Sequence, residues 1–173
     1  DSISNYYSTE VKKQRLKILK EFKNFDFSKK DISKSKNVNE IFYKRKFDFV
    51  LHLAAQPGVR RSFKYPIEYY DSNVTSFFNI LESCRKLKIK KILFASSSSV
   101  YGDSKKFPIT ENFKKEPKNF YALTKCINED MAKFYSKVYK INIVGLRFFT
   151  LFGPFGRPDM FIWRLCENIL FKK

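Results

Sequence analysis

Three apolar segments of strand length, each separated from the next by a helix-like segment, constrain the fold of this chain more than any other feature. They are FDFVLHLAA (47–55), KILFASS (91–97) and INIVGLRFF (141–149). Nearly unbroken apolar runs of this length are typical of strands buried on both faces of a sheet. Their alternation with helical segments predicts an α/β fold in which parallel strands are joined by right-handed crossovers.

Apolar residues at helical spacing predict the segments that connect and flank these strands. In residues 9–22, Val11, Ile18, Leu19 and Phe22 fall on one helix face, and Ser8 or Thr9 can cap its start. Further helices are predicted over 37–45, 67–87, 120–139 and 161–170, and a short strand over 24–27.

Composition restricts the class of protein. A length of 173 residues with 43% hydrophobic residues suits one domain with a real core. The formal charge of +18 is compatible with nucleic acid, an anionic membrane surface or an anionic substrate. Because the basic residues are mostly lysines scattered along the chain, we interpret the charge as background composition and expect no nucleic-acid partner.

Cysteine and histidine content argues against a metal site. The single histidine excludes a histidine-based metal cluster, and Cys84, Cys126 and Cys166 show no paired spacing. Unpaired cysteines suggest a reducing compartment, so a cytoplasmic location is expected. No apolar run reaches membrane-spanning length, and the opening DSISNYY lacks the basic and apolar regions of a signal peptide.

Polar and glycine-containing segments follow each of the three apolar runs. They are LAAQPGVR, SSSSVYG and FFTLFGPFGRPD. Ligands of open parallel sheets bind beyond the carboxyl ends of the strands. The sequence therefore places a candidate site at this edge of the predicted sheet.

Tyr121 and Lys125 lie four residues apart in the helix predicted over 120–139, so they share a helix face. A nearby ammonium stabilises a phenolate and lowers the phenol pKa from about 10, which makes the tyrosine a usable base. A hydroxyl at a strand end, Ser97 or Ser98, can hold the same substrate oxygen. The four-residue spacing does not by itself identify a catalytic pair, since Tyr101 and Lys105 have the same spacing around a turn. The alternative is a partly exposed tyrosine beside a solvated lysine.

The segments LAAQPGVR, SNVTSFFNILE, FASSSSVYG, YALTK and LRFFTLFGPFGRPDM resemble the extended short-chain dehydrogenase/reductases in order and spacing. They are most similar to the nucleotide-sugar 4-epimerases that act on UDP-glucuronate. The resemblance implies a Rossmann-like doubly wound parallel sheet, NAD as cofactor and a UDP-sugar substrate. It also implies inversion at C4 through a 4-keto intermediate, giving UDP-galacturonate.

The resemblance implies roles for particular residues. Tyr121 would be the catalytic base, Lys125 its pKa-lowering partner and a cofactor ligand, and Ser97 would hold the sugar 4-hydroxyl. The other cofactor positions would be Asp1, Asp31, Ile32, Leu53, Ala54, Ala55, Asn73 and Ser96. The other substrate positions would be Gln56, Arg60, Ser98, Thr150 and Arg157. His52 is interpreted as a packed core residue without a role.

Two departures from the family pattern lead us to expect an internal fragment of a longer enzyme. The chain has no GxxGxxG or GxGxxG loop, so the first strand and the phosphate-binding turn are expected to precede Asp1. Residues 1–150 are then a partial NAD-binding domain, and 151–173 begin the substrate-binding region. Relatives commonly dimerise through two helices, which predicts a homodimer through 67–87 and 120–139.

Several alternatives remain open. The 4,6-dehydratases and decarboxylating relatives usually carry an acidic residue at the position of Ser99, and UDP-galactose 4-epimerases typically carry asparagine at the position of Thr150. Ser99 favours simple epimerisation over dehydration and decarboxylation, and Thr150 favours a uronate over galactose as the sugar. A basic nucleic-acid-binding or inactive relative is the alternative outside enzymes.

Overall fold

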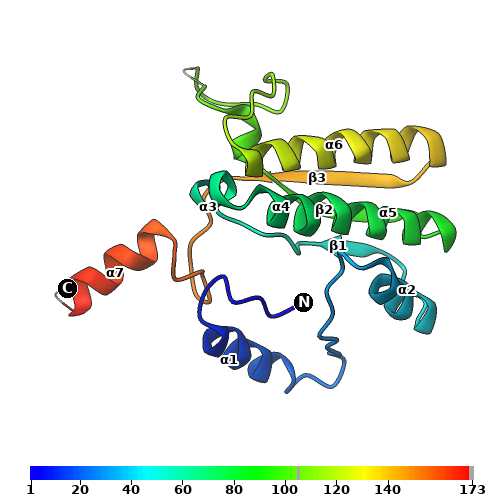
Figure 1. Ribbon diagram of the computed structural model, residues 1–173, viewed down its shortest axis with the longest axis horizontal. Helices are drawn as coiled ribbons and strands as arrows, with labels where there is room; N and C mark the ends of the chain where they lie inside the picture. The colour runs from blue at the N-terminus through cyan, green and yellow to red at the C-terminus, as the bar shows by residue number, and fades with distance from the viewer. Residues whose placement is uncertain (105, 172–173) are drawn as a thin grey trace. The chain divides into compact units, whose positions relative to one another are not determined.

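The computed structural model describes residues 1–104 and 106–171, and the chain forms two compact units (Figure 1). The smaller unit comprises Asp1–Lys29 and Thr150–Lys173, and the larger comprises Lys30–Phe149. Each unit is described by itself below.

The larger unit is built on a parallel three-stranded sheet, as the alternating pattern predicts. Its strands are β1 (Val50–His52), β2 (Lys91–Ser97) and β3 (Asn142–Phe148), in the order β1-β2-β3. In the register of the sheet, Val50 lies opposite Ile92 and Ile92 opposite Ile143. Both junctions are parallel, so the carboxyl ends of the three strands meet at one edge.

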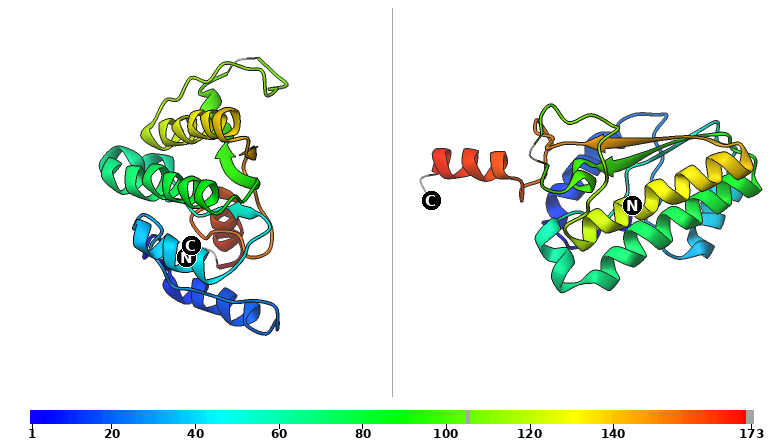
Figure 2. Two further views of the ribbon diagram at one scale, coloured as in Figure 1. Left: turned by 90° about the vertical axis from the view of Figure 1, so that its right-hand side faces the viewer. Right: turned by 90° about the horizontal axis from the view of Figure 1, so that it is seen from above.

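Helices α5 (Ser76–Lys86) and α6 (Phe120–Tyr139) lie on the same side of this sheet (Figure 2). The core forms between them and the strands, where the Phe77 ring lies 4.7 Å from the Phe94 ring. Gly145 of β3 leaves room for that packing, because a Cβ there would meet the Phe94 ring at 2.7 Å. α2 (Ser35–Lys44) adds Val38 and Phe42 to the same core.

The predicted burial of the strands on both faces is wrong. Side chains on the helix-covered face, such as Ile92 and Phe94, are buried, but the opposite face carries Leu51, which is 53% exposed, and Val144, which is 45% exposed. Leu51, Leu93 and Val144 lie in one row across the sheet. Within the described part of the larger unit α5 and α6 cover only one face, and β1 is limited to three residues.

Short elements connect the strands to the long helices. After β1 come α3 (Val59–Lys64), α4 (Pro66–Tyr69) and a π-helical turn η1 (Tyr70–Thr75), which leads directly into α5. The helix predicted over 67–87 is therefore real but contains a π-helical turn. After β2, the 3₁₀ turn η2 (Ser98–Tyr101) starts the loop to α6.

The smaller unit contains α1 (Thr9–Leu19) and α7 (Phe161–Phe171), which agree with the helices predicted over 9–22 and 161–170. Arg15 of α1 donates to the Gly156 carbonyl at 2.7 Å and to the Tyr7 hydroxyl at 3.0 Å. The strand predicted over 24–27 is absent, because these residues form turns and extended chain without a strand partner in the described part of this unit. No helix in the described ranges is both long and apolar enough to cross a membrane.

Candidate functional site

The start of α6 is set by a side-chain cap. Asn119 has an extended backbone, and its Oδ1 accepts a hydrogen bond from the Ala122 amide at 2.8 Å. Asparagine is among the preferred capping residues because its side chain satisfies an otherwise unpaired helix amide. The cap places Tyr121 in the first helical turn and Lys125 in the second.

Tyr121 and Lys125 approach each other as their spacing requires. The Lys125 Nζ lies 5.8 Å from the centre of the Tyr121 ring and donates to the Ala95 carbonyl of β2 at 2.8 Å. Lys125 is 2% exposed, and this burial lowers its pKa to about 8. At neutral pH the side chain is still mostly charged, so a buried ammonium stands beside the phenol.

Ser97 ends β2 and begins the turn that follows it. Its Oγ donates to the Ser99 Oγ at 3.1 Å and accepts from the Ser99 amide at 3.2 Å, which caps η2. Lys125 binds the carbonyl of Ala95, two residues before Ser97. The structure therefore places the ammonium and the Ser97 hydroxyl at the carboxyl end of the same strand.

Ser96 has a different environment from Ser97. It is 3% exposed, and its Oγ donates to Glu129 of α6 at 2.6 Å. Adjacent strand residues point to opposite faces of a sheet, so only one of the two hydroxyls lies on the face that meets α6. The Ser96 hydroxyl thus takes part in packing between strand and helix.

Glu129 and Arg147 are the residues of this region that the sequence analysis missed. The Arg147 Nε and Nη2 donate to the two Glu129 oxygens, each at 2.9 Å. Two signals in the sequence could have found them. Glu129 follows Lys125 by four residues on the same helix face, and Arg147 is a charge inside an apolar strand.

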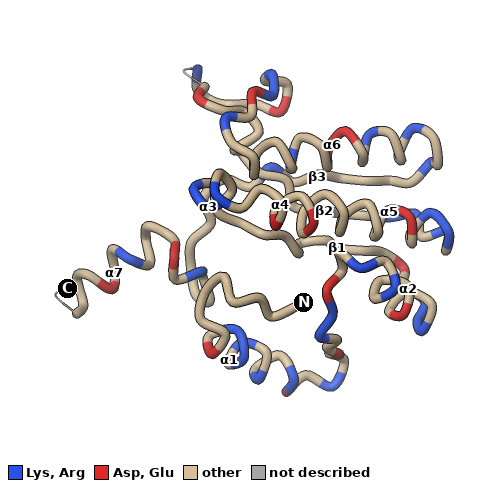
Figure 3. Tube along the Cα trace, in the orientation of Figure 1, with Lys and Arg blue, Asp and Glu red and all other residues tan. Residues whose placement is uncertain are grey.

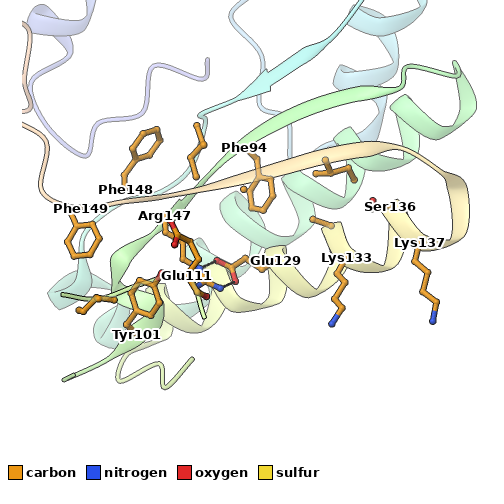
Figure 4. Close-up of a pocket in the computed structure, with 15 residues that line it drawn as sticks. Phe94, Tyr101, Glu111, Glu129, Lys133, Ser136, Lys137, Arg147, Phe148 and Phe149 are labelled. Atoms are coloured by element: carbon orange, nitrogen blue, oxygen red, sulfur yellow. Dashed lines mark hydrogen bonds and ion pairs between the residues drawn. The ribbon is translucent and has the colours of Figure 1, made fainter. Parts of the chain in front are cut away.

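A hollow of about 840 Å³ opens between α6 and β3, and Glu129 and Arg147 point toward each other in its wall (Figure 4). Tyr101, Phe148 and Phe149 also line it, whereas Tyr121, Lys125 and Ser97 do not. The hollow is thus lined by the ion pair and not by the tyrosine–lysine pair.

Asn73 of η1 joins the loop after β1 to α6. It is fully buried, its Oδ1 accepts from the Gln56 amide at 2.7 Å, and its Nδ2 donates to the Gln56 carbonyl at 3.2 Å and to Thr124 Oγ1 at 3.0 Å. The Asn73 amide therefore satisfies both backbone groups of Gln56 and holds the helix turn that carries Tyr121 and Lys125.

We expect Asn73→Ala to lower the free energy of unfolding by about 2–4 kcal/mol, because it leaves the buried amide and carbonyl of Gln56 without partners. Chemical denaturation followed by circular dichroism measures this change. Asn112→Ala, in an exposed turn before α6, is the control and should change the stability by less than about 0.5 kcal/mol. Equal effects of the two substitutions would contradict this assignment.

The remaining candidates of the larger unit lie in different surroundings. Asp31 is exposed, and its Oδ1 accepts from the Ser33 amide at 2.9 Å, while Ile32 packs against the core. Leu53, Ala54 and Ala55 follow β1 in a segment without regular secondary structure, and Arg60 is exposed in α3. Ser98 is half-buried in η2.

His52 is a core residue, as interpreted from the sequence. Its ring stacks on Phe77 at 5.3 Å, and burial, with a smaller contribution from Lys125, lowers its pKa to about 3. It is therefore neutral at physiological pH.

Asp1, Thr150 and Arg157 belong to the smaller unit. The Asp1 Oδ1 accepts from the Ile3 amide at 2.5 Å, and Thr150 is exposed. The Arg157 guanidinium forms a two-pronged ion pair with Asp159, whose Oδ2 also accepts from the Tyr6 hydroxyl. Within this unit the charge of Arg157 is therefore paired.

Comparison with known proteins identifies similar sequences and structures. The model of the NAD dependent epimerase/dehydratase family matches residues 4–173. Protein CapI of Staphylococcus aureus is 43% identical over 98% of this chain and 51% of its own length. UDP-glucuronate 4-epimerase 4 of Arabidopsis thaliana is 38% identical over 98% of this chain and 39% of its own length.

A solved structure matches the whole chain. It is the UDP-glucuronic acid 4-epimerase of Bacillus cereus in complex with UDP-glucuronic acid and NAD, with a TM-score of 0.92 and 33% identity. The match covers 100% of this chain and 54% of that protein. The chain thus spans about half the length of the relatives that it matches.

Proposed function

The chain belongs to the NAD dependent epimerase/dehydratase family, and from this membership we propose that the longer protein expected from the sequence inverts C4 of a UDP-sugar with NAD as cofactor. The substrate that we propose is UDP-glucuronate and the product UDP-galacturonate. One observation carries the proposal: a buried ammonium, Lys125, stands beside Tyr121 and is bonded to β2 two residues before Ser97.

The donors at the strand ends suit a dinucleotide. An ammonium has three N–H donors, of which the Ala95 carbonyl takes one, so Lys125 can also bind ribose hydroxyls. Asp31, Ile32 and the segment Leu53–Ala55 would lie along the cofactor, with Asp1 at the adenosine ribose. Since the polar groups of Asn73 and Ser96 already bond to protein groups, these two would shape the cofactor site more than bind in it. NAD would accept and return the C4 hydride.

In this mechanism Tyr121 removes the proton from the C4 hydroxyl and later returns a proton to the C4 oxygen. The Lys125 ammonium stabilises the phenolate, so the base is available near neutral pH. Ser97 orients the C4 oxygen. Ser98, Gln56 and Arg60, together with Thr150 and Arg157, are the proposed contacts to the sugar and its charged groups. We propose that residues 1–150 supply part of the cofactor domain and 151–173 the start of the substrate region.

The proposed function is tested by incubating the full-length protein with NAD and UDP-glucuronate and separating the UDP-sugars. Appearance of UDP-galacturonate, with C4 alone inverted, supports the proposal. Turnover of UDP-galactose without turnover of UDP-glucuronate would identify the alternative epimerase, and loss of water across C5 and C6 of a UDP-hexose, whose C6 carries a hydroxyl, would identify a 4,6-dehydratase.

The basic charge is the feature that favours a nucleic-acid-binding relative. Lys and Arg are distributed along the chain rather than gathered on one element (Figure 3). Retention of nucleic acid without turnover of any UDP-sugar would nevertheless replace the enzymatic proposal, and that retention should weaken steeply with salt.

We propose a homodimer formed by the outer faces of α5 and α6. On α6, Leu123, Phe134 and Val138 are exposed and fall on one stripe, and Phe78 is exposed on α5. Apolar stripes of this kind mark protein interfaces. The resemblance to dimeric relatives and this stripe point to the same two helices.

Phe134→Glu is expected to convert the dimer of the full-length protein to monomer, because a charge would be buried at the centre of the proposed interface. Light scattering coupled to size-exclusion chromatography measures the mass. Lys133→Glu changes a neighbouring exposed residue on another side of α6 and should leave the dimer intact. A monomeric wild type, or a Phe134→Glu dimer, would exclude this interface.

A further inference from the structure

We infer that Glu129 and Arg147 are positioning residues for the proposed reaction: their ion pair holds α6 against the ends of β2 and β3, so that Tyr121 and Lys125 stay at the strand end that carries Ser97. Neither side chain is proposed to touch substrate or cofactor. The inference rests on the proposed function, and it adds to that function the network that aligns the site.

Three consecutive helix turns of α6 share one face. Tyr121, Lys125 and Glu129 follow one another at intervals of four residues. Lys125 binds the Ala95 carbonyl at 2.8 Å, and Glu129 accepts from the Ser96 hydroxyl at 2.6 Å. Two turns of the helix are thus bonded to two consecutive strand residues, and the next strand residue is Ser97.

Arg147 extends the connection to β3 and to the loop before α6. It lies opposite Ser96 in the sheet register, and its guanidinium binds both oxygens of Glu129. The guanidinium also lies 4.8 Å from the centre of the Tyr101 ring and donates to the Glu111 carbonyl at 3.0 Å. A single ion pair therefore joins both strand ends, η2, the loop and α6.

The pair is poorly accessible to solvent, which gives it rigidity. The Glu129 side chain is 13% exposed and that of Arg147 is 20% exposed. Burial alone would raise the pKa of Glu129, but the hydrogen bonds from Arg147 and Ser96 outweigh it, and the pKa lies below its usual value. A planar two-pronged contact of this kind fixes orientation as well as distance.

Alignment of the base with the strand end controls the rate. A misplacement of about 1 Å by a change far from the reacting atoms can cost about 10²-fold in rate. The carboxylate of Glu129 links α6 to the ends of both β2 and β3, one turn beyond the bond that Lys125 makes to β2. Weakening it should move Tyr121 and Lys125 relative to Ser97 while leaving the sugar and nucleotide contacts in place.

The first test is Glu129→Gln in the full-length protein with NAD and UDP-glucuronate. We expect kcat to fall about 10- to 100-fold with KM changed by less than about threefold. Hydrogen–deuterium exchange should rise in 95–101 and 119–126. Glu82→Gln is the matched control, because Glu82 accepts from the Arg85 guanidinium and the Tyr135 hydroxyl on α5 and α6. It should leave kcat and exchange in these two segments unchanged.

A double substitution distinguishes a purely structural role of the ion pair from a role in aligning the site. Glu129→Leu with Arg147→Met replaces the partly buried ion pair by apolar side chains, and replacing a poorly solvated ion pair in this way often restores or raises stability. We expect the melting temperature of the double variant to be closer to that of the wild type than the melting temperature of Glu129→Gln is. Its kcat should stay at least about tenfold below the wild-type value. Recovery of kcat together with the melting temperature would overturn the inference, as would wild-type kcat in Glu129→Gln.

Failure of the proposed function has a different result. If the wild type turns over no UDP-sugar, the function is wrong, and the exchange measurements still decide whether Glu129 orders the two segments. Increased exchange in 95–101 and 119–126 for Glu129→Gln, but not for Glu82→Gln, would support the alignment network. Unchanged exchange would overturn it.

Discussion

Replacing Tyr121 with phenylalanine is expected to lower kcat for C4 epimerisation by about 10³-fold, at the upper part of the range for loss of a general base. The substitution removes only the hydroxyl. The ring remains available for its edge-to-face contact with Tyr69, whose centre lies 6.3 Å away. Turnover of UDP-glucuronate by the full-length protein measures the effect on the chemical step. Calorimetric titration with UDP measures the effect on nucleotide binding.

The control for this substitution is Tyr43→Phe, since Tyr43 is an exposed tyrosine of α2. It should retain wild-type kcat. UDP should bind to the Tyr121→Phe protein with an affinity within about threefold of the wild type, because the phenol is needed for proton transfer and not for the nucleotide. A Tyr121→Phe protein with more than a tenth of wild-type kcat would remove Tyr121 from the role of base.

Lys125→Met should lower kcat at pH 7 by about 10²- to 10³-fold, because it removes the ammonium that we propose stabilises the phenolate. Part of the loss should be recovered as pH rises, since alkali then ionises the phenol directly. A rate that is low but independent of pH between 7 and 9.5 would contradict this role.

The same substitution has a stability effect with a defined sign. The pKa of Lys125 is about 8 in the folded protein, against an ordinary lysine value of 10.5, so folding opposes its charge. Below pH 8 this cost is complete, and it disappears as pH rises from 8 to 10.5 because the unfolded chain then releases its proton too. The shift corresponds to about 3 kcal/mol.

We therefore compare the free energy of unfolding of Lys125→Met with that of the wild type at two pH values. The difference, variant minus wild type, should be about 3 kcal/mol more positive at pH 7 than at pH 10.5. Urea unfolding of both proteins at the two pH values measures it, and comparing differences cancels the loss of the bond to Ala95. Lys133→Met, on an exposed part of α6, is the control and should show no such change. A Lys125→Met difference that is constant with pH would mean that Lys125 is not buried.

Much of the architecture is readable from local patterns. β2 and α6 agree with the predicted ranges 91–97 and 120–139 residue for residue. An apolar run that ends in serines and a helix that begins after a capping Asn119 are both local signals. The shared face of Tyr121 and Lys125 follows from helix geometry alone, since it needs no information about the sheet.

Burial of the sheet could not be read in the same way. Apolar runs predict that a strand can be buried on both faces, but exposure depends on which elements cover each face. The helix-covered face is buried, and the face that carries Leu51 and Val144 is not. The π-helical turn that points Asn73 at Gln56 is likewise set by contacts 17 residues apart rather than by local preference.

The α/β order and the spacing of the phenol and the ammonium follow from local sequence, because each is a short-range property of periodicity, capping or helical turn, and the parallel sheet follows from that order. Three further features arise only when the chain is packed: Ser96 turns toward Glu129, Arg147 meets the same carboxylate, and burial lowers the pKa of Lys125 to about 8. Those features depend on strand register and on helix packing against the sheet. Strand register and helix packing bring together groups that lie 18 to 33 residues apart in the sequence. No local sequence pattern encodes contacts at such separations.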